Sequence, residues 1–468
     1  MAINAGIDMA MEPYDLNYCT LLKELVQEKK VPMSRIDDAV RRVLRLKFRL
    51  GLFDHPNTLL KDYPLFGSKE HALIALHAAE ESEVLLKNKD NILPLPQGKK
   101  LLVTGPNANS MRCLNGGWSY SWQGHLTDRF ADKYNTIYEA ICNKFGADHV
   151  RLEQGVTYKP EGAYMEENEP EIEKAVAAAR NVDIIIACIG ENSYCETPGN
   201  LSELAISANQ SKLVKTLATT GKPIILILNE GRPRIINELE PLADAVIDIL
   251  LPGNYGGDAL ANILAGDVNP SAKMPYTYPR HEAALTTYDY RVSEEMDKME
   301  GAYDYNAVVS VQWPFGYGLS YTTFEYSNFQ TDKSSFTTGD DLHFSIDVTN
   351  TGKYAGKEVV QVYISAPEGA LEKPYQELAA YGKTDELAPG ESQTLTISYN
   401  TTEMSSYSEE KAAYIMEAGD YVVRVGNSSR NTKAAAVISL DETAVSEQLS
   451  NQLAQDKEIT ELSNKDAT

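Results

Sequence analysis

Residues 183–190 read DIIIACIG, a continuous apolar run that ends in glycine, and similar runs occur elsewhere in the chain. These are LLVTGP at 101–106, PIILILNEG at 223–231 and AVIDILLPG at 245–253. Helical patterns separate them, as at 172–180 and 207–219. Apolar strands that alternate with helices are typical of a mainly parallel α/β sheet. We therefore predict an α/β domain over residues 98–290.

The pattern changes on both sides of this region. Residues 21–53 follow helical spacing with a break at Val31–Pro32, and a second helix is expected from Glu70 to Val84. Beyond residue 330 apolar and polar residues alternate, as in LHFSIDVTN and EVVQVYISA, which predicts a small all-β sandwich. From about Asp441 the chain is polar with weak periodicity, so we expect a frayed helix or a disordered tail there.

Composition excludes several classes of protein. The formal charge of −24 repels phosphate backbones, so no nucleic-acid partner is expected. No run approaches the ~18 apolar residues of a membrane span, and the opening MAINAGIDMAMEP has no signal-peptide pattern. We expect no membrane partner, and the compartment stays open, with the periplasm or secretion possible if an upstream part exists. The cysteines are scattered singly, which argues against a disulfide framework: Cys19, Cys113, Cys142, Cys188 and Cys195.

Motifs for cofactor chemistry are absent from the sequence. The run GNYGGD at 253–258 lacks the GxGxxG order of a dinucleotide-binding loop, and there is no Walker A, GxSxG or HExxH motif. The seven histidines show no metal-ligand spacing. We therefore expect neither a cofactor nor a metal, and a nucleotide-binding function has little support.

Two loops that follow apolar strands carry side chains suited to a sugar. LNGGWSYSWQG at 114–124 holds Trp118 and Trp122, whose indole faces can stack on a sugar ring, although tryptophans four apart are more often packing residues. GENSYCETPGNLSE at 190–203 holds Glu191 and Glu196, and a loop carboxyl can protonate a leaving oxygen, although most loop glutamates only face solvent. Both loops leave one parallel sheet, so we expect Trp122 to line a cleft beside Glu196.

Several long motifs resemble those of glycoside hydrolase family 3 and occur in the family's own order. These two loops carry the resemblance, as do AINAGIDMAM (2–11), SRIDDAVRRVLRLKFRLGLFD (34–54), ESEVLLKN (81–88), NPSAKMPYTYPR (269–280) and WPFGYGLSYTTFEYSN (313–328). It implies the end of a (β/α)8 barrel, an α/β sandwich and a fibronectin type III-like domain. The expected boundaries are a barrel remnant at 1–60, a helical linker at 61–97, the α/β domain at 98–290, a connecting segment at 291–330, the fibronectin-like domain at 331–440 and a polar tail at 441–468.

The resemblance also implies roles for the candidate residues. Glu196 matches the family's general acid/base, Trp122 and Trp118 match a wall of the aglycone subsite, and Glu191 is a neighbouring structural or substrate-contact carboxylate. The family's nucleophilic aspartate lies in an SDW-like motif upstream of AGIDM, and this chain contains no SDW. Retaining hydrolysis needs two carboxyls, and only one has a candidate here.

The resemblance therefore predicts a β-glucosidase that acts on oligosaccharides but is incomplete by itself. Its missing barrel would be supplied in cis or as a separate chain. A non-catalytic carbohydrate-binding or interaction module and a β-xylosidase of the same family are the alternatives.

Overall fold

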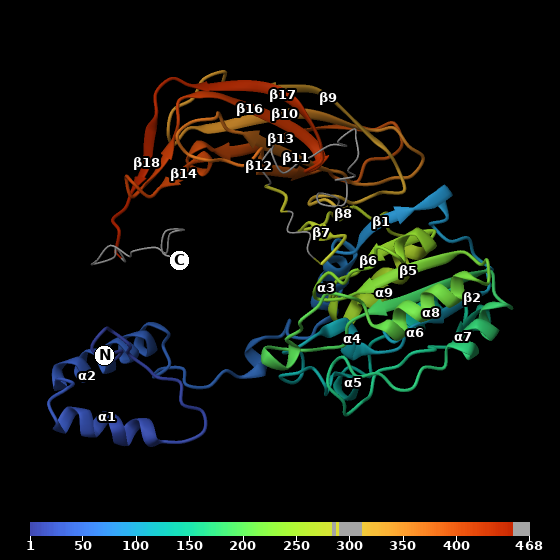
Figure 1. Ribbon diagram of the computed structural model, residues 1–468, viewed down its shortest axis with the longest axis horizontal. Coiled ribbons are helices and arrows are strands. Elements are labelled where there is room, and N and C mark those ends of the chain that lie inside the picture. The colour runs from blue at the N-terminus through green and yellow to red at the C-terminus, as the bar shows by residue number, and fades with distance from the viewer. Residues whose placement is uncertain (283–286, 290–310, 453–468) are drawn as a thin grey trace, which may run out of the picture. The chain divides into compact units, whose positions relative to one another are not determined.

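The computed structural model describes residues 1–282, 287–289 and 311–452. It divides into two compact units, Met1–Leu73 and Ile74–Thr468, which are treated separately below (Figure 1). Within the described residues, no helix combines the length and the apolar character needed to span a bilayer.

The first unit is a pair of helices with little core of its own. α1 (Asn17–Gln27) and α2 (Met33–Arg49) are separated at Val31–Pro32, where the sequence predicts a break. The first helix ends in a left-handed turn at Lys29, whose φ is +59°, where the Lys30 N–H donates to the Leu25 carbonyl at 2.9 Å, and Pro32 is the N-cap of the second helix. Among residues 1–73, all of which are described, only Val31 and Ala39 are buried. Arg35 ties this unit together through Asp8, at 2.5 Å, and the carbonyl of Ile3, at 2.8 Å.

The second unit begins with a mainly parallel sheet, as predicted. In the described part of the chain this sheet has six strands in the order β1-β6-β5-β4-β2-β3, with β1 antiparallel to its neighbour and the others parallel. The strands are β1 (Val84–Asn88), β2 (Leu101–Thr104), β3 (Val150–Leu152), β4 (Ile184–Gly190), β5 (Ile224–Asn229) and β6 (Ala245–Asp248).

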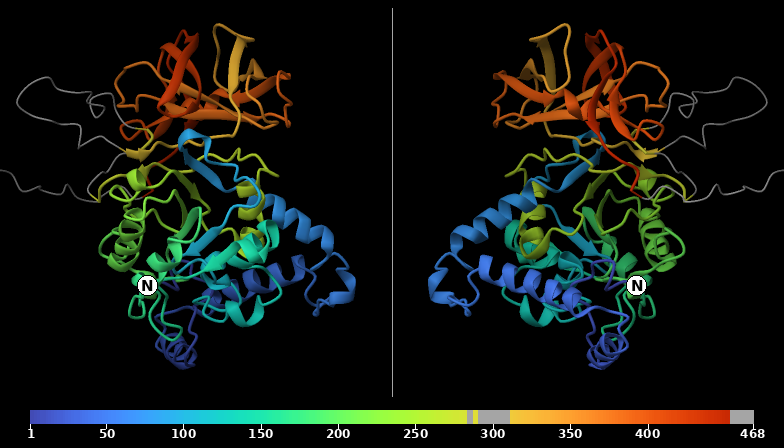
Figure 2. Two further views of the ribbon diagram at one scale, coloured as in Figure 1. Left: turned by 90° about the vertical axis from the view of Figure 1, so that its right-hand side faces the viewer. Right: turned by 90° about the vertical axis from the view of Figure 1, so that its left-hand side faces the viewer.

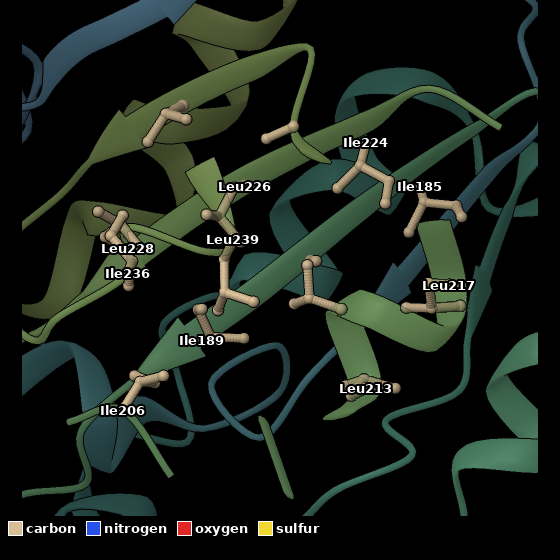
Figure 3. Close-up of a cluster of buried hydrophobic side chains, with 14 of the residues drawn as sticks. Ile185, Ile189, Ile206, Leu213, Leu217, Ile224, Leu226, Leu228, Ile236 and Leu239 are labelled. Carbon is tan, nitrogen blue, oxygen red and sulfur yellow. The ribbon is translucent and has the colours of Figure 1, made fainter. Parts of the chain in front are cut away.

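Helices cover both faces of this sheet. One face packs on α7 (Ile172–Ala179) and α8 (Ala208–Ala218), and the other packs on α6 (Ile137–Phe145) and α9 (Gly256–Ala265). Alternate residues of each strand enter the two cores. Figure 3 shows Ile185, Ile189 and Leu226 on the face that α8 covers. Burial on both faces explains why the strands are continuously apolar.

The prediction from the sequence was wrong for one strand of this sheet, which it assigned to a helix and a helical linker. A helix was expected to reach Val84 and a helical linker to continue to residue 97, but α3 (Lys69–Glu80) ends earlier and Val84–Asn88 pairs with β6 as an edge strand. Val84, Leu85 and Leu86 are at most 1% exposed, because the strand contributes side chains to both cores. Helical spacing alone could not reveal this pairing partner, which lies about 160 residues downstream.

An antiparallel β-sandwich follows, as predicted (Figures 1 and 2). One sheet has the order β13-β10-β9 and the other β12-β11-β16-β17, and a shared core lies between them. Their strands are β9 (Phe324–Thr331), β10 (Asp341–Asn350), β11 (Val359–Ser365), β12 (Glu377–Lys383), β13 (Ser392–Asn400), β16 (Gly419–Ser428) and β17 (Asn431–Leu440).

Two segments next to the sandwich differ from expectation. Phe324, expected in a connecting segment, begins β9, whose partner is β10. Within the expected polar tail, Ala444–Gln448 forms β18 (a frayed helix or disorder was predicted), because β15 (Ala413–Met416) offers it an edge to pair with. Residues 291–310 of the connecting segment and 453–468 of the tail lie outside the described residues. Two short pairs complete the strands: β7 (Tyr278–Pro279) with β8 (Val311–Trp313), and β14 (Ser406–Ser408) with β15.

The exposed face of α2 predicts self-association of this chain. Val40, Leu44 and Phe48 recur every four residues and are 50%, 39% and 65% exposed. An apolar stripe of this kind favours association or dye binding. We expect light scattering to show concentration-dependent oligomers, and the double substitution Leu44→Glu, Phe48→Glu to reduce them. A monodisperse monomer that binds no hydrophobic dye would contradict an uncovered helix face.

Glu83 predicts a pH-dependent stability. Both of its carboxyl oxygens are buried without a hydrogen-bond partner, and burial, with the Glu80 carboxylate adding to it, raises the pKa of Glu83 well above 4.5. The folded state therefore keeps this proton to higher pH than the unfolded state. The stability contributed by this proton is complete at pH values below the pKa of Glu83 in the unfolded chain. It is lost as pH rises toward and through the pKa of Glu83 in the folded protein, by about 1.4 kcal/mol per pH unit between these two pKa values.

Glu83→Gln, which cannot ionise, should remove this loss. We expect urea denaturation at about pH 5 and about pH 7 to show the variant gaining on the parent protein as pH rises. Exposed Glu81→Gln, which instead loses ion pairs with Lys357 and Lys383, serves as the comparison. Parallel pH profiles for Glu83→Gln and the parent would show that Glu83 is not buried as a neutral acid.

Candidate active site

The two loops that carry the predicted site leave neighbouring strands of the sheet. β3 lies on one side of β2 and β4 on the other, so the order in which strands are added reverses between β2 and β4. Ligands of open α/β sheets bind outside the carboxyl ends of the strands at such a reversal. The aromatic loop, residues 116–124, follows β2 and the short helix α4 (Met111–Asn115), and the acidic loop, residues 190–203, follows β4.

Hydrogen bonds join the two loops directly. The Gln123 amide donates from Nε2 to the carbonyl of Cys195, at 2.8 Å, and accepts on Oε1 from the N–H of Cys195, at 3.0 Å. The Ser193 hydroxyl donates to the Gln123 carbonyl at 2.6 Å. Since Gln123 follows Trp122 and Cys195 precedes Glu196, the segments that hold the predicted aromatic and acidic residues lie side by side.

Two glycines allow this close approach. A Cβ on Gly117 would lie 2.2 Å from the carbonyl oxygen of Tyr194 and 2.9 Å from the Cβ of Cys195. One on Gly124, whose φ is +71°, would lie 2.8 Å from the Cβ of Ser193. Any larger residue would push the loops apart, which accounts for the glycines that bracket the tryptophans.

Both tryptophans face outward. Trp118 is 69% exposed and Trp122 is 45% exposed, so neither belongs to a core. The Trp118 N–H donates to the Trp122 carbonyl at 2.9 Å and closes the loop between them. Trp118 and Tyr120 both have φ of +58°, a conformation that costs a side-chain-bearing residue free energy. Packing in a core thus does not explain the two tryptophans, and their indole faces are available to a ligand.

Glu196 occupies a strained turn. It is exposed, and its backbone has φ +54° and ψ −146°, a region that is almost restricted to glycine and costs about 1–3 kcal/mol. The 3₁₀ turn Thr197–Gly199 follows at once, and the Gly199 N–H donates to the Glu196 carbonyl at 2.8 Å. Strain of this kind persists only where surrounding contacts hold it, and it recurs at functional sites.

Glu191 has a different environment from Glu196. It is 4% exposed, and it accepts hydrogen bonds from the Tyr194 hydroxyl at 3.0 Å, the Gly231 N–H at 3.3 Å and Arg232 Nη2 at 2.8 Å. A second cation, Arg234, lies 3.7 Å away. Of the two roles that the sequence left open for Glu191, these contacts favour the structural one.

Sequence reasoning missed the arginines that hold Glu191. Arg232 and Arg234 follow β5, the next strand of the sheet, in the run NEGRPR at 229–234. They therefore leave the same sheet edge as Glu191, which follows β4. The signal was present in the sequence, because cations after one parallel strand are expected near carboxylates after its neighbour.

Glu230 and Asp248 form a buried acidic pair, and Glu230 Oε1 accepts a hydrogen bond from the Arg234 N–H at 3.2 Å. The Tyr278 hydroxyl is 2.6 Å from Glu230 Oε1 and 2.7 Å from the carbonyl of Arg234. Burial raises the pKa of Glu230, and the nearby Asp248 carboxylate raises it further. Burial beside Asp248 thus favours the protonated form of Glu230, whose Oε1 accepts a hydrogen bond from the Tyr278 hydroxyl. In the described part of the chain no group of His, Cys, Asp or Glu is arranged to hold a metal ion.

Comparisons with known proteins identify the fold and the sequence family. Residues 83–321 match the glycosyl hydrolase family 3 C-terminal domain, and residues 358–429 match the fibronectin type III-like domain. The chain is 37% identical over 447 residues to the lysosomal beta glucosidase of Dictyostelium discoideum, and 30% identical over 442 residues to a beta-xylosidase of Formosa agariphila. These alignments cover 91% and 92% of this chain but 52% and 59% of the two relatives, so the chain spans little more than half of their length.

A solved structure gives the same result in three dimensions. The β-glucosidase of Listeria innocua in complex with glucose superposes with a TM-score of 0.80 and 28% identity, over 94% of this chain and 59% of that one. The family match to residues 83–321 takes in more than half of the 468 residues. The chain belongs to glycoside hydrolase family 3, and it carries the family's C-terminal α/β domain followed by a fibronectin type III-like domain.

Proposed function

We propose that this chain supplies the general acid/base and the aglycone wall of a retaining, exo-acting β-glucosidase that removes terminal β-D-glucosyl residues from oligosaccharides. The observation that carries the proposal is the contact between the two loops, which sets the exposed Glu196 turn beside the exposed Trp122 at the reversal point of the sheet. The names of its relatives, most of them β-glucosidases, support the reaction class.

In this proposal Glu196 moves the protons of a double displacement. A nucleophilic aspartate on a barrel domain attacks C1 of the glucosyl ring while Glu196 protonates the departing oxygen, and Glu196 then activates the water that releases the sugar. The two carboxyls of such a site stand about 5–5.5 Å apart. The sequence has no SDW motif, so the aspartate comes from a barrel in the same protein or in a second chain. Trp122, with Trp118 beyond it, provides a flat apolar surface for the leaving sugar.

A β-xylosidase is the second candidate, because relatives with that name match the chain at 30% identity. A glucoside and the corresponding xyloside differ at the C5 substituent of the glycone, whereas the residues proposed here act on the glycosidic oxygen and the aglycone. Comparison of aryl β-glucosides with aryl β-xylosides in the completed enzyme decides between the two. Oligosaccharide binding without turnover in that same enzyme would favour the non-catalytic alternative.

In this proposal the chain by itself should not hydrolyse aryl β-glucosides, because its sequence has no SDW-like motif to provide the nucleophilic aspartate. Highly purified chain is expected to release no nitrophenol above the rate of a Glu196→Gln preparation made in parallel. Steady turnover that Glu196→Gln abolishes would mean that another carboxylate of this chain acts as the nucleophile.

With a barrel supplied, fused or as a second chain, Glu196→Ala should slow cellobiose hydrolysis by about 10²–10⁴-fold, the usual contribution of acid–base catalysis. Formation of the glycosyl-enzyme from a dinitrophenyl glucoside should be spared, because that leaving group hardly needs protonation. Azide, which needs no general base, should speed its release as the β-glucosyl azide.

Two glutamates of the same loop serve as controls. Glu203→Ala, on the exposed far end of the loop, should behave as the parent enzyme does. Glu191→Ala should lower stability, since it leaves Arg232 without its buried partner. If Glu191→Ala showed the azide-rescue pattern and Glu196→Ala did not, the acid/base assignment would be wrong while the family would stand.

A further inference from the structure

The turn that carries Glu196 is held on both sides by side chains from other loops. On the N-terminal side, the Gln123 amide binds both backbone polar groups of Cys195, at 2.8 and 3.0 Å. On the C-terminal side, Arg232 Nη1 donates to the carbonyl of Gly199 at 2.6 Å. The strained residue thus lies between two fixed points that come from loops after β2 and β5.

Contacts with Glu191, Tyr164 and Tyr194 fix the position of Arg232 itself. Its Nε and Nη2 donate to Glu191 Oε1 at 3.2 and 2.8 Å, and Nη2 also reaches the Tyr164 hydroxyl at 3.2 Å. The guanidinium lies over the ring of Tyr194, with Cζ 3.8 Å from the centroid, and Tyr194 in turn donates its hydroxyl proton to Glu191. One planar cation therefore links the buried carboxylate, an aromatic ring of the acidic loop and the far end of the Glu196 turn.

These contacts suit arginine and no other residue. A guanidinium presents five N–H donors in one plane and can serve Glu191, Gly199 and Tyr164 at once while it stacks on Tyr194. A lysine amine is a single point with three donors and cannot span the same set. Lysine at this position should keep the charge beside Glu191 but release the carbonyl of Gly199.

We propose that Arg232 and Gln123 are positioning residues for Glu196, an inference that rests on the proposed acid/base role of that residue. They hold the turn Cys195–Gly199 in its strained conformation and so fix the direction from which the carboxyl reaches a leaving oxygen. Neither side chain contacts the reacting atoms in this scheme, and each acts through the backbone of the turn.

Cys195 makes the position of the turn measurable in this chain without any turnover. Cys195 precedes Glu196 and is a half-buried residue, whereas Cys113 and Cys188 are fully buried. In a background with Cys19→Ser and Cys142→Ser, reaction with a thiol reagent such as 5,5′-dithiobis(2-nitrobenzoate) reports how often the turn opens.

Three substitutions distinguish the contribution of Arg232 to holding the Glu196 turn from that of Gln123. Arg232→Met removes the fork and the ring contact, and Arg232→Lys keeps only the charge. Gln123→Glu keeps the acceptor for the Cys195 N–H but replaces the donor to its carbonyl. The matched control is Arg129→Met, which removes an exposed arginine that lies over Phe130 and contributes nothing to the turn.

We expect Arg232→Met to speed Cys195 labelling by about ten- to a hundredfold, the range that corresponds to losing one charge-assisted hydrogen bond and one cation–π contact. Arg232→Lys and Gln123→Glu should give smaller increases, and Arg129→Met none. Gln123→Glu leaves the Glu191 ion pair intact, so it tests the proposal even if Arg232→Met fails to fold. Labelling at the parental rate in folded Arg232→Lys and Gln123→Glu would overturn the proposal.

A second measurement tests whether fixing the turn helps Glu196 to transfer protons. In the barrel-completed enzyme, Arg232→Lys should lower kcat for cellobiose more than for a dinitrophenyl glucoside, with KM changed little. Faster labelling combined with equal losses on both substrates would contradict a positioning role. If the completed parent enzyme turned over neither substrate, the proposed function would fail, whereas the labelling rates would still decide whether Arg232 holds the turn.

Discussion

Burial of both faces of the central strands is the constraint from which the rest of the second unit follows. Successive residues of β4 and β5 enter opposite cores, and all of them are buried, so no position within these strands can carry an exposed polar group. Chemistry is therefore restricted to the strand ends. There the Asn107 amide donates to the carbonyl of Glu191 and to Asn229 Oδ1, both at 3.0 Å, and ties together the carboxyl-terminal ends of β4 and β5.

That restriction explains which parts of the structure the sequence could predict. A continuous apolar run such as 183–190 needs cover on both faces, so the α/β class and the location of the two loops followed from local pattern alone. The strand at Val84–Asn88 and the strand at Ala444–Gln448 could not be predicted in the same way, because each depends on a partner edge distant in sequence. Pattern reports the periodicity of a segment but not the neighbour that completes it.

The candidate site divides along a similar line. Glu196, Trp118 and Trp122 were identified from residue type, loop position and resemblance, and the structure leaves all three exposed. The difference between Glu196 and Glu191 was not accessible, since two glutamates five residues apart in one loop look alike in sequence. Burial and Arg232 separate them. An ion pair of this kind adds little net stability, but loss of one partner leaves an unpaired charge that costs about 3–5 kcal/mol.

The strained turn at Glu196 also bears on the thermodynamics of assembly. Ordering a flexible backbone costs about 1–2 kcal/mol per residue, and a loop that orders only on contact subtracts this from the free energy of association. Here the contacts from Gln123 and Arg232 meet that cost within a single chain. A domain or substrate that approaches this edge of the sheet therefore meets a preorganised surface, and more of its contact free energy remains available for affinity.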